Sequence, residues 1–135
     1  MTAPRVPVMA DATPTSRRAA QRRATGARAE SLVCEHLERQ GFDILARNVR
    51  VGRLEIDVIA RRRDLLVFCE VRARSSAERV FPSQTVEGQK GHRVRRAVAE
   101  WLRRNRPGAI QVRIDVASIV FDTPEGRLTY LEGAL

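Results

Sequence analysis

Cysteine, lysine, aromatic residues and long apolar runs are all scarce in this sequence of 135 residues. Because it contains no run of about 18 apolar residues, we expect no transmembrane helix and no membrane partner. The N-terminus lacks the apolar segment of a signal peptide, so secretion by that route is not expected either. Two cysteines cannot build a disulfide-rich scaffold or, by themselves, a zinc site. These absences favour a cytoplasmic protein with reduced thiols.

Positive charge is in clear excess, with 25 basic residues against 16 acidic ones and a formal net charge of +9. All but one of the basic residues are arginines, a bias that a GC-rich genome also produces. Residues 1–28 hold six arginines and one aspartate, so they carry more than half of the excess. Such a balance predicts attraction to polyanions, of which nucleic acid is the commonest, and DNA is the partner that we expect.

Two parts of different composition follow one another along the chain. Residues 1–25 are rich in Ala, Pro, Thr and Arg without an apolar period, which predicts a disordered basic tail. A mitochondrial transit peptide is the alternative for this segment, because it is rich in arginine and poor in acids. Residues 26–135 are predicted to form a single folded domain.

The apolar pattern of residues 26–135 predicts an α/β domain with the order α-β-β-β-α-β-β. Helices are expected from about Ala27 to Gly41 and from about Val86 to Asn105. Five strands are expected at Phe42–Arg50, Leu54–Ala60, Leu65–Arg72, Ile110–Phe121 and Arg127–Leu131. This order indicates a mixed sheet of about five strands covered by two helices.

Acidic residues occupy the predicted hairpin formed by the second and third strands. Every second residue of a strand points to the same face, so Leu54, Ile56, Val58 and Ala60 should lie together, on the face opposite Glu55 and Asp57. If the turn is centred just after residue 63, paired positions sum to 127. Asp57 then lies directly opposite Glu70, and a slip of one residue would destroy this pairing.

Two carboxylates that face each other repel unless a cation neutralises them. Mg²⁺ or Mn²⁺ would suit Asp57 and Glu70, with the carbonyl of Val71 as a third ligand and phosphate oxygens completing the shell. Such an ion polarises a phosphate and lowers the pKa of an attacking water. Arg72, on the face of Glu70, would stabilise charge that develops on phosphorus. The alternative is a solvent-facing strand surface with ordinary cross-strand ion pairs.

A further carboxylate, Glu30, stands at the first position of the apolar stripe of the first helix, ahead of Val33, Cys34 and Leu37. A buried carboxylate is costly unless it is paired or binds a cation. Alternatively, Glu30 lies at the start of the helix, reaches solvent and favours the helix dipole.

These residues resemble a known family. Residues 55–60 (EIDVIA) and 67–74 (VFCEVRAR) are similar to the "GEIDLIA…VFVEVKxR" core of the YraN family, an uncharacterised bacterial and cytoplasmic protein family. The similarity covers about residues 26–120. It includes Glu30, Asn48 and Arg50, the lysine Lys90 at the second helix, and the strand with Arg113 and Asp115.

The resemblance implies a restriction-endonuclease-like fold of the PD-(D/E)xK group, similar to Holliday-junction resolvases. It implies a metal-dependent nuclease site acting on DNA, including branched DNA, with the catalytic residues Glu30, Asp57, Glu70 and Arg72 and the metal ligands Asp57, Glu70 and Val71. Phosphate contacts are expected from Arg50, Arg74, Lys90 and Arg93.

The sequence departs from the family pattern at two positions. Arg72 replaces a lysine and, since arginine stays protonated, it cannot act as a general base. Leu54 replaces the glycine before Glu55. Two alternatives therefore stay open: a nucleic-acid-binding module without catalysis, and a protein-interaction or structural domain. A homodimer is a further open expectation, because resolvase-like enzymes often cut two strands symmetrically.

Overall fold

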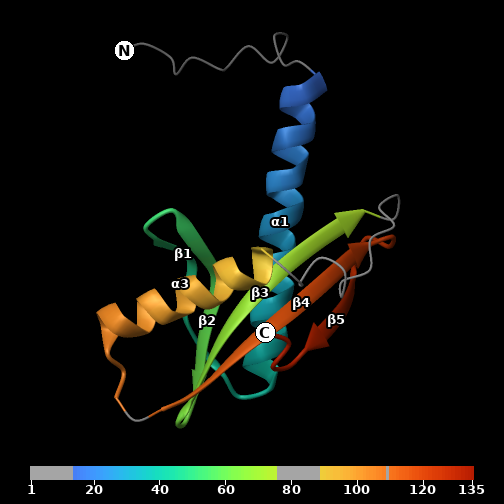
Figure 1. Cartoon of the computed structure of the whole chain (residues 1–135). Coiled ribbons are helices and arrows are strands. Elements are labelled where there is room, and N and C mark those ends of the chain that lie inside the picture. The colour runs from blue at the N-terminus through green and yellow to red at the C-terminus, as the bar shows by residue number, and fades with distance from the viewer. Residues whose placement is uncertain (1–13, 76–88, 109) are drawn as a thin grey trace, which may run out of the picture.

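The computed structural model describes residues 14–75, 89–108 and 110–135 (Figure 1). The helices and strands in these ranges follow the predicted order α-β-β-β-α-β-β, so the fold class is confirmed. Their bounds are α1 (Pro14–Arg39), β1 (Asp43–Val51), β2 (Leu54–Arg62), β3 (Leu65–Ser75), α3 (Gln89–Asn105), β4 (Gln111–Phe121) and β5 (Arg127–Leu131).

One mixed sheet contains the strands in the order β1-β2-β3-β4-β5. Neighbouring strands are antiparallel, except that β3 and β4 run parallel. A parallel pair needs a crossover connection, and α3 belongs to the segment that links these two strands. The two helices cover opposite faces of the sheet (Figure 1).

Buried apolar side chains form two clusters, one beneath each helix. The cluster beneath α1 joins Ala29, Val33, Cys34 and Leu37 to Val58, Ala60, Val67, Cys69, Ala117 and Ile119. The cluster beneath α3 joins Val94, Ala97 and Val98 to Ile56, Ile59, Leu66 and Phe68. Burial of each valine, leucine, isoleucine or phenylalanine side chain contributes about 1.5–3 kcal/mol, so these clusters hold the helices on the sheet.

The first helix begins earlier than predicted. Residues 14–25, which were expected to be disordered, belong to α1, and this expectation was wrong for them; residues 1–13 lie outside the described part of the chain. Alanine and arginine are strong helix formers, and extending a helix that is already packed costs far less than starting one. The arginines of this extension, Arg17, Arg18, Arg22 and Arg23, are exposed. Neither described helix is apolar enough over sufficient length to span a membrane.

Candidate active site

The pairing of β2 with β3 has the predicted register. The pairs run from Arg62↔Leu65 through Ala60↔Val67 to Val58↔Cys69, and the two residue numbers always sum to 127. Extending this register by one residue brings Asp57 opposite Glu70. The turn between the strands includes Arg63 with a φ of 55°.

The regular pairing of β2 stops at Asp57. Among the described strand residues, the last β2–β3 pair is Val58↔Cys69, and the β1–β2 pairs pass over Asp57 and Asn48. Asn48 has a φ of 50°, a left-handed conformation that interrupts β1 at the same level. One carboxylate oxygen of Asp57, Oδ2, accepts a hydrogen bond of 2.8 Å from the backbone N–H of Val71. A side chain thus replaces the strand ladder where β2 leaves β3.

This interruption also changes which face of the sheet the apolar residues of β2 cover. Val58 and Ala60 pack beneath α1, whereas Ile56 and Leu54 pack in the cluster beneath α3. The prediction that all four share a face was therefore wrong. Strict alternation assumes an unbroken ladder, and β2 is unpaired from β3 at Asp57.

Alternation does hold along β3. Val67 and Cys69 pack beneath α1, while Leu66 and Phe68 pack beneath α3. Glu70 and Arg72 continue the parity of Leu66 and Phe68, so we place them on the α3 side of the sheet. Both are buried, with 9% and 7% of their surfaces exposed.

An open cleft of about 250 Å³ lies where β2 and β3 separate beside the first turns of α3. Its acidic residues are Glu55, Asp57 and Glu70, and its basic residues are Arg53 and Arg93. Leu54 and Val94 supply apolar lining. The cleft therefore combines three carboxylates with two guanidinium groups.

The carboxyl group of Asp57 is strongly perturbed. Burial, then the charge of Glu70 and, to a smaller extent, the charges of Glu30 and Glu55 raise its pKa from 3.8 to about 7. The N–H of Val71 acts in the opposite direction, because it stabilises the ionised form. Near neutral pH this group is thus divided between its protonated and its ionised form.

Arg72 lies next to these carboxylates. Burial lowers the pKa of its guanidinium group, and the nearby charges of Glu70 and Asp57 oppose that effect. An arginine remains protonated under such conditions, so Arg72 keeps a positive charge beside the two acids. The predicted role of Arg72, to stabilise charge that develops on phosphorus, stays a prediction.

Glu30 belongs to α1 and does not line the cleft. Because α1 begins at Pro14, Glu30 lies in the interior of the helix, which removes the alternative that placed it at a helix start. Its Oε2 atom accepts a hydrogen bond of 2.9 Å from Asn48 Nδ2 and lies 3.8 Å from a guanidinium nitrogen of Arg47. Glu30 acts on Asp57 through its charge, and its described hydrogen bond joins it to β1.

The predicted metal ligands are only partly brought together. Asp57 and Glu70 line one cleft, whereas the described contact of Val71 is made by its N–H, not by its carbonyl. Within residues 14–75, 89–108 and 110–135, no group of three or more His, Cys, Asp or Glu side chains is arranged to hold a metal ion. Two carboxylates would suffice for Mg²⁺ only if waters and substrate oxygens completed its shell.

The predicted phosphate-binding residues occupy different places. Arg93 lines the cleft, Arg50 is exposed on β1 opposite Glu55, and Arg74 is half-buried on β3. Lys90 belongs to α3, but its side chain lies outside the described part. Sequence reasoning missed Arg53, which enters the cleft from the β1–β2 turn; its place directly before Leu54 and Glu55 was the available signal.

The motif residues Arg113 and Asp115 have a structural role. The carboxylate of Asp115 is fully buried and accepts two hydrogen bonds from Arg113, at 2.9 and 3.0 Å. It also accepts hydrogen bonds from the hydroxyl of Tyr130 and the backbone N–H of Gly133. This network ties β4 to β5 and the C-terminal residues, and none of its members lines the carboxylate cleft.

Comparison with known proteins identifies a family whose profile covers the residues of the candidate site. Residues 29–119 match the profile of "Uncharacterised protein family UPF0102", a match that includes Glu30, Asp57, Glu70 and Arg72. The chain belongs to the UPF0102 family. The predicted YraN-like relationship is thereby confirmed at the level of the family. The match starts at Ala29, the first buried residue of α1, so the basic extension precedes it.

Individual UPF0102 proteins are similar along most of their length. One from Sorangium cellulosum is 44% identical over 111 residues, which cover 80% of this chain and 76% of the relative. One from Anaeromyxobacter sp. is 36% identical over 116 residues, covering 86% and 87%. One from Parafrankia sp. is 44% identical over 91 residues, covering 67% and 76%.

Proposed function

We propose that the chain is a nuclease-like protein of the PD-(D/E)xK type that hydrolyses phosphodiester bonds of DNA with Mg²⁺ or Mn²⁺. One observation carries this proposal: the Asp57 carboxyl group, with its pKa raised to about 7, shares an open cleft with Glu70. Placing two acids this close is unfavourable, and a divalent cation would remove the repulsion.

The residues of the cleft would divide the work. Asp57 and Glu70 would hold the ion, and the N–H of Val71 fixes the orientation of the Asp57 carboxylate. A bound ion would polarise the scissile phosphate and lower the pKa of an attacking water. Arg72 would stabilise the charge that develops on phosphorus. The negative charge of Glu30, on α1, would help to keep the pKa of Asp57 raised.

Cleavage of a labelled four-way junction and of a linear duplex control tests this function. We expect wild-type protein to cut with Mg²⁺ or Mn²⁺, to be inactive in EDTA, and to lose at least about a hundredfold in rate on Asp57→Asn. The ratio of the two substrates measures any preference for branched DNA. Wild-type protein that cuts no substrate with either ion would contradict hydrolysis, and so would cutting that is unaffected by Asp57→Asn.

A nucleic-acid-binding module without catalysis is the second candidate. It is favoured by the replacement of the family lysine with Arg72, which leaves no general base at that position. It is also favoured because the described residues contain no group of three or more His, Cys, Asp or Glu side chains arranged to hold a metal ion. This candidate predicts salt-dependent DNA binding that survives both EDTA and Asp57→Asn. DNA binding that required a divalent ion and Asp57 would count against it.

A further inference from the structure

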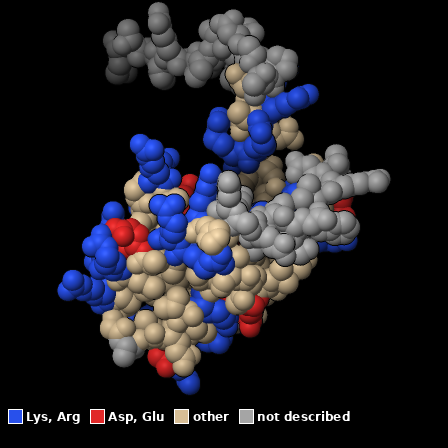
Figure 2. Space-filling model, viewed as in Figure 1, with Lys and Arg blue, Asp and Glu red and all other residues tan. Residues whose placement is uncertain are grey.

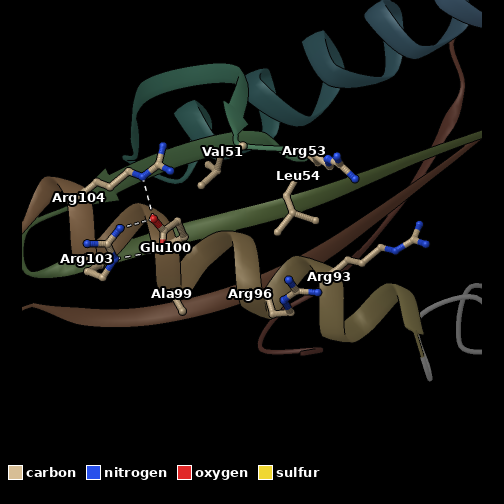
Figure 3. Close-up of a pocket in the computed structure, with 10 residues that line it drawn as sticks. Val51, Arg53, Leu54, Arg93, Arg96, Ala99, Glu100, Arg103 and Arg104 are labelled. Carbon is tan, nitrogen blue, oxygen red and sulfur yellow. Dashed lines mark hydrogen bonds and ion pairs between the residues drawn. The ribbon is translucent and has the colours of Figure 1, made fainter.

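A larger groove, of about 880 Å³, runs between the β1–β2 turn and one face of α3 (Figure 3). Its basic lining consists of five arginines, Arg53, Arg93, Arg96, Arg103 and Arg104, and its acidic lining consists of Glu100 alone. Basic side chains also gather over these two elements in the surface view (Figure 2). The groove is therefore strongly cationic.

The five arginines fall into two sets along the groove. At the C-terminal end of α3, Glu100 accepts hydrogen bonds from Arg103 and from Arg104, whose Nε atom lies 2.8 Å away. These bonds lower the pKa of Glu100 to about 2, so it stays ionised and offsets part of their charge. In the described part of the chain, Arg53, Arg93 and Arg96 form no ion pair.

Two of the groove's arginines, Arg53 and Arg93, lie next to the candidate active site. Arg53, Leu54 and Arg93 line both the groove and the carboxylate cleft, so the two hollows adjoin. In Figure 3, Arg53 from the turn and Arg93 from α3 extend toward the same side, away from Glu100. Arg53 and Arg93 thus place positive charge at the end of the groove that meets the carboxylates of the cleft.

We propose that this groove binds the phosphodiester backbone of one nucleic-acid strand and leads it into the carboxylate cleft. Guanidinium groups match phosphate oxygens with paired hydrogen bonds, which makes arginine well suited to such contacts. A ligand that extends through the groove into the cleft must be a polymer, so a free phosphate would occupy only part of it. The direction toward the cleft rests on the proposed function, whereas backbone binding in the groove does not.

Two adjacent arginines of α3 provide a matched test. Arg95 and Arg96 are both exposed, but only Arg96 lines the groove. Binding of a fluorescent DNA duplex with a single-stranded overhang is measured by anisotropy in EDTA at several salt concentrations. We expect Arg96→Ala to weaken binding and to reduce the slope of log K against log salt by about 1, the value for one phosphate contact. Arg95→Ala should leave the slope unchanged.

A pair of triple variants separates a local site from overall charge. The groove variant combines Arg53→Ala, Arg93→Ala and Arg96→Ala. The control variant combines Arg39→Ala, Arg61→Ala and Arg95→Ala, so both remove three exposed arginines. In the groove variant the slope of log K against log salt should fall by about 3, whereas the control variant should keep most of the wild-type slope. Equal losses in both variants, or no loss in the groove variant, would overturn the proposal; circular dichroism confirms that each variant is folded.

The DNA-binding test of the groove and the cleavage test of the proposed function can fail independently of each other. Because binding is measured in EDTA, a selective loss in the groove variant supports the backbone site even if wild-type protein cuts no DNA. Conversely, metal-dependent cutting with unchanged binding by the groove variant would reject this site and leave the hydrolytic function standing.

Discussion

Asp57 is the residue at which strand geometry and electrostatics meet. It ends the β2–β3 ladder, binds the N–H of Val71 through its side chain, and has a pKa raised to about 7 by burial and by Glu70. In the ionised form, burial and the repulsion from Glu70 outweigh the hydrogen bond from Val71, so the charged carboxylate destabilises the fold.

The raised pKa of Asp57 should make the stability of the protein depend on pH. Between about pH 4 and pH 7 the folded state keeps a proton on Asp57 that the unfolded chain releases, so stability falls as pH rises through this window. Asparagine carries no such penalty and can still accept the Val71 hydrogen bond. In EDTA we expect Asp57→Asn to be more stable than wild type by about 2 kcal/mol at pH 8 and nearly equal at pH 4.5.

Urea denaturation at the two pH values measures this difference. A variant that is less stable than wild type at pH 8 would show that the ionised carboxylate is stabilised in the fold. The same series with Asp43→Asn, an exposed acid at the start of β1, controls for the change in net charge.

Among the elements, the β2–β3 hairpin has one feature that agrees with the sequence-based prediction and one that does not. Its register agrees with the one that follows from assuming a turn centred between Arg63 and Asp64, an assumption that no Asn-Gly or Asp-Gly dipeptide fixed. The switch of faces at Asp57 was not predictable, because it arises with the left-handed Asn48 and a side-chain bond to Val71. The pairing of Glu100 with Arg103 and Arg104 was readable, since residues three and four apart are neighbours on a helix.

The N-terminal part of α1 is the element that the sequence misplaced. Its side chains are exposed or half-buried from Ser16 to Arg28, and the buried face begins at Ala29. Deletion of residues 1–25 should therefore lower the melting temperature by less than about 4 °C, the shift that about 1 kcal/mol causes in a domain of this size. Calorimetry of the full chain and the truncated chain tests this, and loss of cooperative melting would show that the extension belongs to the core.

Over the whole molecule, charge and stability are divided between different regions. The groove and cleft on the α3 side collect partly uncompensated charge, whereas Asp115 holds β4 to β5 with a fully satisfied buried carboxylate. Composition predicted the positive excess, but its concentration beside the cleft depends on which arginines the fold brings together. The buried network was visible only as the Arg113 and Asp115 motif.

Asp115 should matter for stability more than for the chemistry of the cleft. Asp115→Ala removes one partner of a buried ion pair and leaves Arg113 and Tyr130 without their acceptor, which costs about 3–5 kcal/mol. Asp122→Ala breaks an ion pair with the exposed Arg127 and should cost at most about 1 kcal/mol. Urea titrations of both variants compare the two, and equal losses would contradict a special role for Asp115.

Divalent-cation binding tests the central claim most directly. We expect calorimetric titration with Mn²⁺ to show one site per chain at pH 8, with weaker binding at pH 6, where Asp57 is largely protonated. Asp57→Asn should abolish this binding, and Glu125→Gln, a change at an exposed acid outside the cleft, should leave it intact. Wild-type protein that binds no Mn²⁺ at pH 8, or binding that persists in Asp57→Asn, would contradict the assignment of this cleft as a metal-dependent active site.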